Sequence, residues 1–96
     1  EMLTLPVERV TFKAPETMSG PNVHRLKMDV MESFNDEPQE IIIDFTDVDY
    51  VDMHGLIILK DICELIKTSG TQGFACNLNP DMHELLTEID LLAATG

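Results

Sequence analysis

Hydrophobic and polar positions along the chain predict short β-strands separated by helices. Val10 and Phe12 alternate with polar residues within the segment 8–13, which is typical of a strand with one buried face. Residues 1–5 are a second short strand candidate. The isoleucine run at 41–43 is apolar on both faces, so it predicts a central strand covered on both sides. Residues 74–78 predict one more short strand.

Three helices are predicted around these strands. The first should end by residues 35–37, because Pro38 disfavours helical geometry in the residue before it. The second covers residues 56–66 and ends at Gly70, and the third starts at Asn79 as N-cap with Pro80 in its first position. The apolar stripes of the first and third helices are Val23, Leu26, Val30 and Phe34, and Met82, Leu85, Leu86 and Ile89.

The order of these elements favours an α/β domain with a partly parallel sheet. Residues 14–22 and 44–55 are expected to be connections. At 96 residues the chain has the length of one compact domain, spanning residues 1–96.

Charge narrows the range of partners. Six basic residues against 18 acidic ones give a net charge of -12, which disfavours binding to nucleic acid or to an anionic membrane and favours a basic partner. Cys63 and Cys76 lack metal-type spacing and are expected to be two buried thiols in a reducing compartment. The alternative is one disulfide in an oxidising location.

The most informative segment follows the isoleucine run. Four carboxylates, Asp44, Asp47, Asp49 and Asp52, precede the second helix, and Asp52 is placed to cap its N-terminus. Gly55 lies in the first turn, where glycine costs helix propensity, so another backbone or a partner is expected to approach closely there.

At this segment the sequence resembles the STAS domain family. The resemblance rests on an apolar strand ending in Asp44, the turn Asp52-x-x-Gly55-Leu56, and a Leu-rich helix closed by glycine. It implies an α/β, STAS-like fold, with a four- to five-stranded mixed sheet and helices packed on it. Family members carry a further strand and helix after the position of Leu91, so the chain is expected to be a minimal module, truncated at its C-terminus, or part of a longer protein.

The family includes bacterial anti-sigma-factor antagonists, so the resemblance implies a cytoplasmic, non-enzymatic regulator of transcription that binds a kinase-like anti-sigma factor without a cofactor. In those antagonists the kinase phosphorylates the hydroxyl residue directly after the aspartate of the turn. Here Met53 occupies that position and has no hydroxyl, so the usual phosphoserine switch should be absent. The predicted partner-binding turn is Asp52, Met53, His54 and Gly55, and Leu56 and Ile58 begin the adjoining helix surface.

Other interpretations remain open at this point. The family also includes the cytoplasmic domains of sulfate-type anion transporters. The four carboxylates are candidate ligands for Mg²⁺ or Ca²⁺ in a metal-dependent enzyme, although solvated turn residues are the simpler interpretation. His54 is a candidate general base, with a surface contact favoured over catalysis. Ile57, Ile58 and Leu65 widen the apolar stripe of the second helix, which indicates burial in the core or docking of a partner or second copy.

Overall fold

The computed structural model describes residues 8–88, which form five strands, three α-helices and one short 3-10 helix. The strand candidate at residues 1–5, Ile89 of the third helix and the residues after it lie outside this range. The elements in chain order are β1 Arg9–Lys13, β2 Thr17–Met18, α1 Gly20–Ser33, η1 Phe34–Asp36, β3 Glu40–Asp44, β4 Tyr50–Val51, α2 Met53–Thr68, β5 Gln72–Cys76 and α3 Pro80–Glu88.

The strands form two sheets rather than one. The larger sheet has the order β1-β3-β5 and the smaller one pairs β2 with β4, and every described pairing is parallel. The α/β class is confirmed, whereas the expected mixed sheet of four or five strands is divided into three and two. The Asp44 carboxylate accepts the Thr46 N–H at 2.9 Å in a turn directly after β3, and this turn separates β3 from β4.

The two connections predicted for residues 14–22 and 44–55 are more structured than expected. The first contains β2 and the start of α1, and the second contains β4 and the start of α2. Two-residue strands are too short to show an alternating pattern, which is why the sequence did not predict them.

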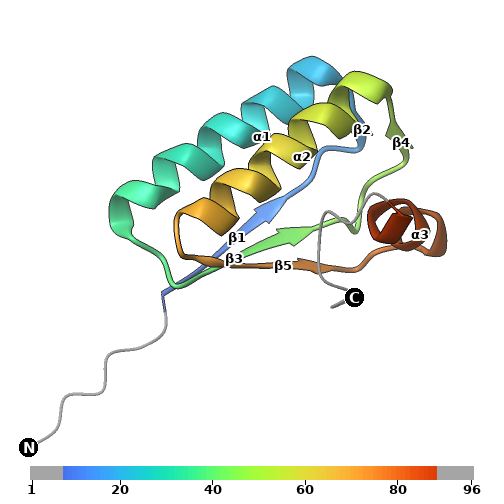
Figure 1. Cartoon of the computed structure of the whole chain (residues 1–96). Helices are drawn as coiled ribbons and strands as arrows, with labels where there is room; N and C mark the ends of the chain where they lie inside the picture. The colour runs from blue at the N-terminus through green and yellow to red at the C-terminus, as the bar shows by residue number, and fades with distance from the viewer. Residues whose placement is uncertain (1–7, 89–96) are drawn as a thin grey trace, which may run out of the picture.

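Helices α1 and α2 lie side by side on one face of the larger sheet (Figure 1). This follows from the topology, because β1-α1-β3 and β3-α2-β5 are successive crossovers between parallel strands that advance in one direction. Crossovers of the same right-handed sense then place both helices on the same face. Helix α3 lies near the ends of the strands where β5 leads out of the sheet (Figure 1).

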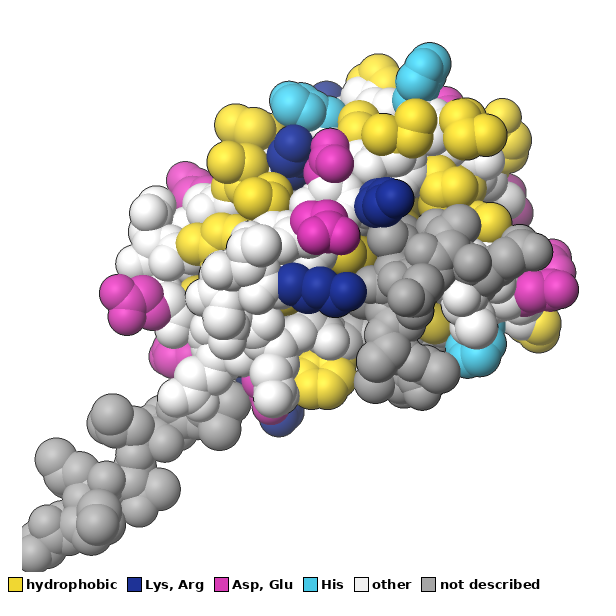
Figure 2. Space-filling model, viewed as in Figure 1, with side chains coloured by type: hydrophobic (Ala, Val, Ile, Leu, Met, Phe, Trp, Pro, Cys, Tyr) yellow, Lys and Arg dark blue, Asp and Glu magenta, His cyan; other side chains and the backbone are white. Residues whose placement is uncertain are grey.

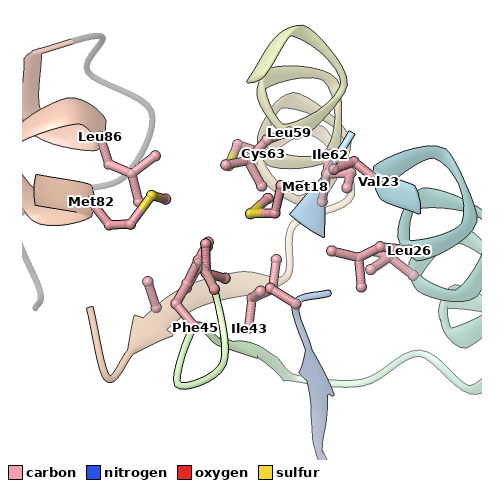
Figure 3. Close-up of a cluster of buried hydrophobic side chains, with 14 of the residues drawn as sticks. Met18, Val23, Leu26, Ile43, Phe45, Leu59, Ile62, Cys63, Met82 and Leu86 are labelled. Carbon is pink, nitrogen blue, oxygen red and sulfur yellow. The ribbon is translucent and has the colours of Figure 1, made fainter. Parts of the chain in front are cut away.

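The core fills the space between the sheet and the helices. Met18, Ile43 and Phe45 are buried there, and Met82 and Leu86 of α3 point toward the same cluster (Figure 3). In β3, Ile41 and Ile43 are buried whereas Ile42 on the opposite face is half-buried. The prediction of a central strand is therefore correct, but complete burial applies only to the face that meets the helices.

The helix ends follow the predicted signals. Glu37 has φ 50° directly before Pro38, after η1 has ended the first helix. Gly70 has φ 83° after the end of α2, the left-handed geometry that glycine adopts at helix C-termini. The Asn79 side chain accepts the Met82 N–H at 2.8 Å, which confirms it as the cap of α3.

Candidate functional site

The predicted partner-binding turn lies where β4 leads into α2, and we call residues 50–57 the β4–α2 corner. Three hydrophobic side chains are exposed here: Tyr50 by 58%, Met53 by 69% and Ile57 by 53%. Met53 and Ile57 are four residues apart on α2, so they share one face of its first turns. Figure 2 shows hydrophobic side chains gathered at this end of the molecule, above the start of α2.

Asp52 fixes the start of the helix. Its side-chain Oδ1 accepts the Gly55 N–H at 2.6 Å, so it is the N-cap that the sequence predicted. Its own N–H donates to the Met18 carbonyl at 3.2 Å, which ties the corner to β2. These bonds hold the exposed side chains of the corner on a defined backbone.

Gly55 makes the close backbone approach that its position predicted. A Cβ at this residue would lie 1.9 Å from the Met18 carbonyl oxygen and 3.3 Å from Val23 Cγ2. Gly55 is buried, so it shapes the corner from beneath and offers no surface of its own.

His54 is exposed beside the start of α1. Its Cβ lies 3.0 Å from the position that a Cβ on Gly20 would occupy. The absence of a side chain on Gly20 therefore lets the N-termini of α1 and α2 approach each other. This places His54 at the rim of the corner, next to Met53.

The hydrophobic residues of α2 divide into two groups. Ile58 is half-buried and packs against the core, whereas its neighbour Ile57 is exposed. Leu56 and Leu65 are half-buried. Sequence reasoning selected Ile58 for the helix surface, named Ile57 only in the wider apolar stripe that was either buried or available for docking, and did not consider Tyr50. The spacing of Ile57 from Met53 was an available signal, but the exposure of Tyr50 depends on β4.

Three of the four carboxylates of the preceding segment have separate local roles. Asp44 accepts hydrogen bonds from Thr46 and from the Asn77 amide, Asp47 pairs with Lys13 at 3.1 Å, and Asp52 caps α2. The Thr46 and Asn77 donors lower the pKa of Asp44 to about 2. Within residues 8–88, no group of three or more metal-binding side chains comes together.

The cysteines also have different environments. Cys63 is buried, and burial raises the pKa of its thiol to about 11. Cys76 is half-buried at the end of β5, and the two thiols are free. The expectation of two buried thiols is correct for Cys63 and only partly so for Cys76.

Comparison with known proteins identifies the family of this chain. None of the helices between residues 8 and 88 is both long enough and apolar enough to cross a membrane. A search of curated proteins found no match to the chain. The family model of the STAS domain, however, matches residues 5–94, which include both sheets, all three helices and the β4–α2 corner. The chain therefore belongs to the STAS domain family.

Proposed function

We propose that this domain is a regulatory protein-binding module that docks its partner through the β4–α2 corner, in the manner of an anti-sigma-factor antagonist. Domains of this family are generally binding modules without catalytic activity, found as anti-sigma-factor antagonists or in association with transporters. The observation that carries the proposal is the exposure of Tyr50, Met53 and Ile57 together on a backbone fixed by the Asp52 cap. Exposed aromatic and methionine side chains are enriched in protein interfaces.

In this proposal the partner bound is a protein and the binding is not controlled by a phosphoserine. The hydroxyl that antagonists of the family present after the aspartate of the turn is replaced by the Met53 thioether, which is 69% exposed. A thioether accepts no phosphoryl group, and an unbranched apolar side chain instead adapts to the surface it meets. The expected result is a partner that stays bound until another signal or competitor releases it.

The absence of the switch is tested with a serine kinase of the anti-sigma type. The wild-type domain should gain no phosphate within residues 52–55, as measured by mass spectrometry of the digested protein. Met53→Ser restores a hydroxyl at the same position and serves as the positive control for recognition by the kinase. A stoichiometric phosphate in the wild-type corner would contradict the proposal.

The docking surface is tested with matched methionine variants. Met53→Asp should weaken partner binding by about 30-fold or more, because truncating or charging a central interface residue costs roughly 2 kcal/mol or more. Met28→Asp is the control, since Met28 is also exposed, by 53%, but lies on α1. Partners are captured by photocrosslinking from position 57 and identified by mass spectrometry. Equal binding by the two variants, with melting curves unchanged, would reject the corner as the docking surface.

A further inference from the structure

A second feature lies next to the corner. Between β4 and α3 there is a groove of about 250 Å³, which we call the β4–α3 groove. It is smaller than the roughly 300–1,000 Å³ of ordinary small-molecule sites, so its size suits a single long side chain. It is lined by Val48, Asp49, Tyr50, Val51, Asn79, Asp81, Met82 and Leu85.

The lining of this groove has an apolar base and an acidic rim. Val48 and Met82 are buried, Val51 and Leu85 are half-buried, and Asp49 and Asp81 are exposed. Among the described residues that line it, none is Lys, Arg or His. An apolar base with two carboxylates at the edge matches a side chain that has a hydrocarbon stem and a cationic end.

Hydrogen bonds hold the two walls of the groove in place. The N–H groups of Asp49 and Tyr50 both donate to the Glu16 carbonyl, at 2.8 and 3.2 Å. On the other wall, the Asn79 cap fixes the first turn of α3, which carries Asp81. The two carboxylates therefore project from anchored backbone segments, which reduces the entropy lost when a ligand binds.

Tyr50 joins the groove to the docking surface. It lines the groove and is one of the three exposed hydrophobic residues of the corner. A partner that covers Met53 and Ile57 would thus have a side chain next to the groove. The net charge of -12 also draws a basic partner toward this domain and disfavours a second copy of it.

We propose that the β4–α3 groove receives an arginine side chain of the partner protein, with its guanidinium between Asp49 and Asp81 and its stem on Val51 and Leu85. Arginine is favoured over lysine because its planar guanidinium donates to two carboxylates at once and stacks on an aromatic ring such as Tyr50. This assignment rests on the proposed function, since it describes how the same partner would be recognised.

A second acidic groove provides the internal comparison. It lies between β1 and α1, has a volume of about 480 Å³, and includes Asp29, Glu32 and Asp36 in its lining. It includes none of the exposed corner residues Tyr50, Met53 and Ile57. If negative charge alone attracted arginine, this groove would bind it at least as well.

The test uses N-acetyl-arginine amide as the probe and two-dimensional NMR of the domain as the readout. Increasing probe concentration should cause saturable shifts of the amide signals of Tyr50, Val51, Met82 and Leu85. N-acetyl-citrulline amide has a similar shape without the charge and should cause none. Asp49→Asn/Asp81→Asn should weaken the arginine effect about tenfold, because it removes both charge-assisted hydrogen bonds. The control Asp29→Asn/Glu32→Gln makes the same change in net charge at the other groove and should leave the effect unchanged.

The possible outcomes are distinct. The assignment is overturned by equal shifts with citrulline, by shifts centred on the β1–α1 groove, or by equal weakening in the two double variants. Because the probe is a single amino acid, this result does not depend on the docking of a protein at Met53. If the probe does not bind but Met53→Asp still weakens binding of the partner protein, the groove assignment alone is rejected. If the probe binds in the groove but Met53→Asp leaves binding of the partner unchanged, the docking surface alone is rejected.

Discussion

At the scale of single residues, Gly55 is the position on which the shape of the corner depends most directly. The carbonyl oxygen of Met18 occupies the space that any Cβ at residue 55 would need, at 1.9 Å. The Met18 carbonyl belongs to the backbone of β2 and accepts the Asp52 N–H, so it has little freedom to move away. A side chain at residue 55 would therefore push α2 away from β2.

We predict that Gly55→Ala destabilises the domain by about 2–4 kcal/mol. Alanine gains about 1 kcal/mol of helix propensity over glycine, but overpacking against backbone outweighs this gain. Urea unfolding followed by circular dichroism measures the difference. The comparison is Gly20→Ala, where the new Cβ would lie 3.0 Å from the His54 Cβ, so a shift of a few tenths of an ångström relieves the contact and the loss of stability should be smaller. Equal stability of the two variants would show that the β2 backbone moves away from a Cβ at residue 55 with little loss of stability.

The lowered pKa of Asp44 should make the stability of the domain depend on pH. Its folded-state pKa of about 2 lies below the unfolded value of about 3.9, so ionised Asp44 stabilises the folded state. This contribution is complete above the unfolded pKa and is lost as the pH falls through 4 toward 2. Asp44→Asn should flatten the stability curve in this interval, measured by urea unfolding at successive pH values. A slope identical to wild type would contradict the assignment.

At the scale of elements, local signals were sufficient for most of the fold. The three helices were predicted because their caps and periodic stripes lie within a few residues of each other in sequence, as with Asp52 and Gly55. Strands β2 and β4 were missed because each has two residues and exists only through its pairing with the other. The same reason explains why Tyr50 was not recognised as part of the site.

Two neighbouring isoleucines of helix α2 have different environments, since Ile58 packs against the core and Ile57 is exposed. Ile58→Asp should destabilise the domain by several kcal/mol, because it places a charge against the core cluster. Ile57→Asp should change stability by less than about 1 kcal/mol, because Ile57 is 53% exposed, yet it should weaken partner binding. Thermal melting and a binding titration on both variants separate the two effects. A severe loss of stability in Ile57→Asp would place this residue in the core instead.

At the scale of the whole molecule, charge is the dominant feature. Among residues 8–88 the ion pairs are Arg9–Glu40, Lys13–Asp47 and Lys27–Asp61, and each has at least one side chain more than half exposed. Exposed pairs of this kind stabilise a protein by about 0–1 kcal/mol each. The excess of acidic over basic residues leaves a net charge of -12, whose mutual repulsion opposes the compact state.

We predict that added salt stabilises the domain, because the repulsion among acidic groups outweighs the attraction within the exposed ion pairs. Screening weakens the three exposed ion pairs found within residues 8–88 and a larger number of repulsions. The Debye length falls from about 30 Å at 0.01 M to about 10 Å at 0.1 M salt. Each kcal/mol by which screening reduces the repulsion in the folded state should raise Tm by about 4–8 °C, measured by thermal unfolding across this range of NaCl. Glu8→Lys/Glu64→Lys replaces two exposed carboxylates and should raise the Tm at low salt while reducing the effect of NaCl. A Tm that falls with salt would mean that the ion pairs outweigh the repulsion, because screening would then remove more attraction than repulsion.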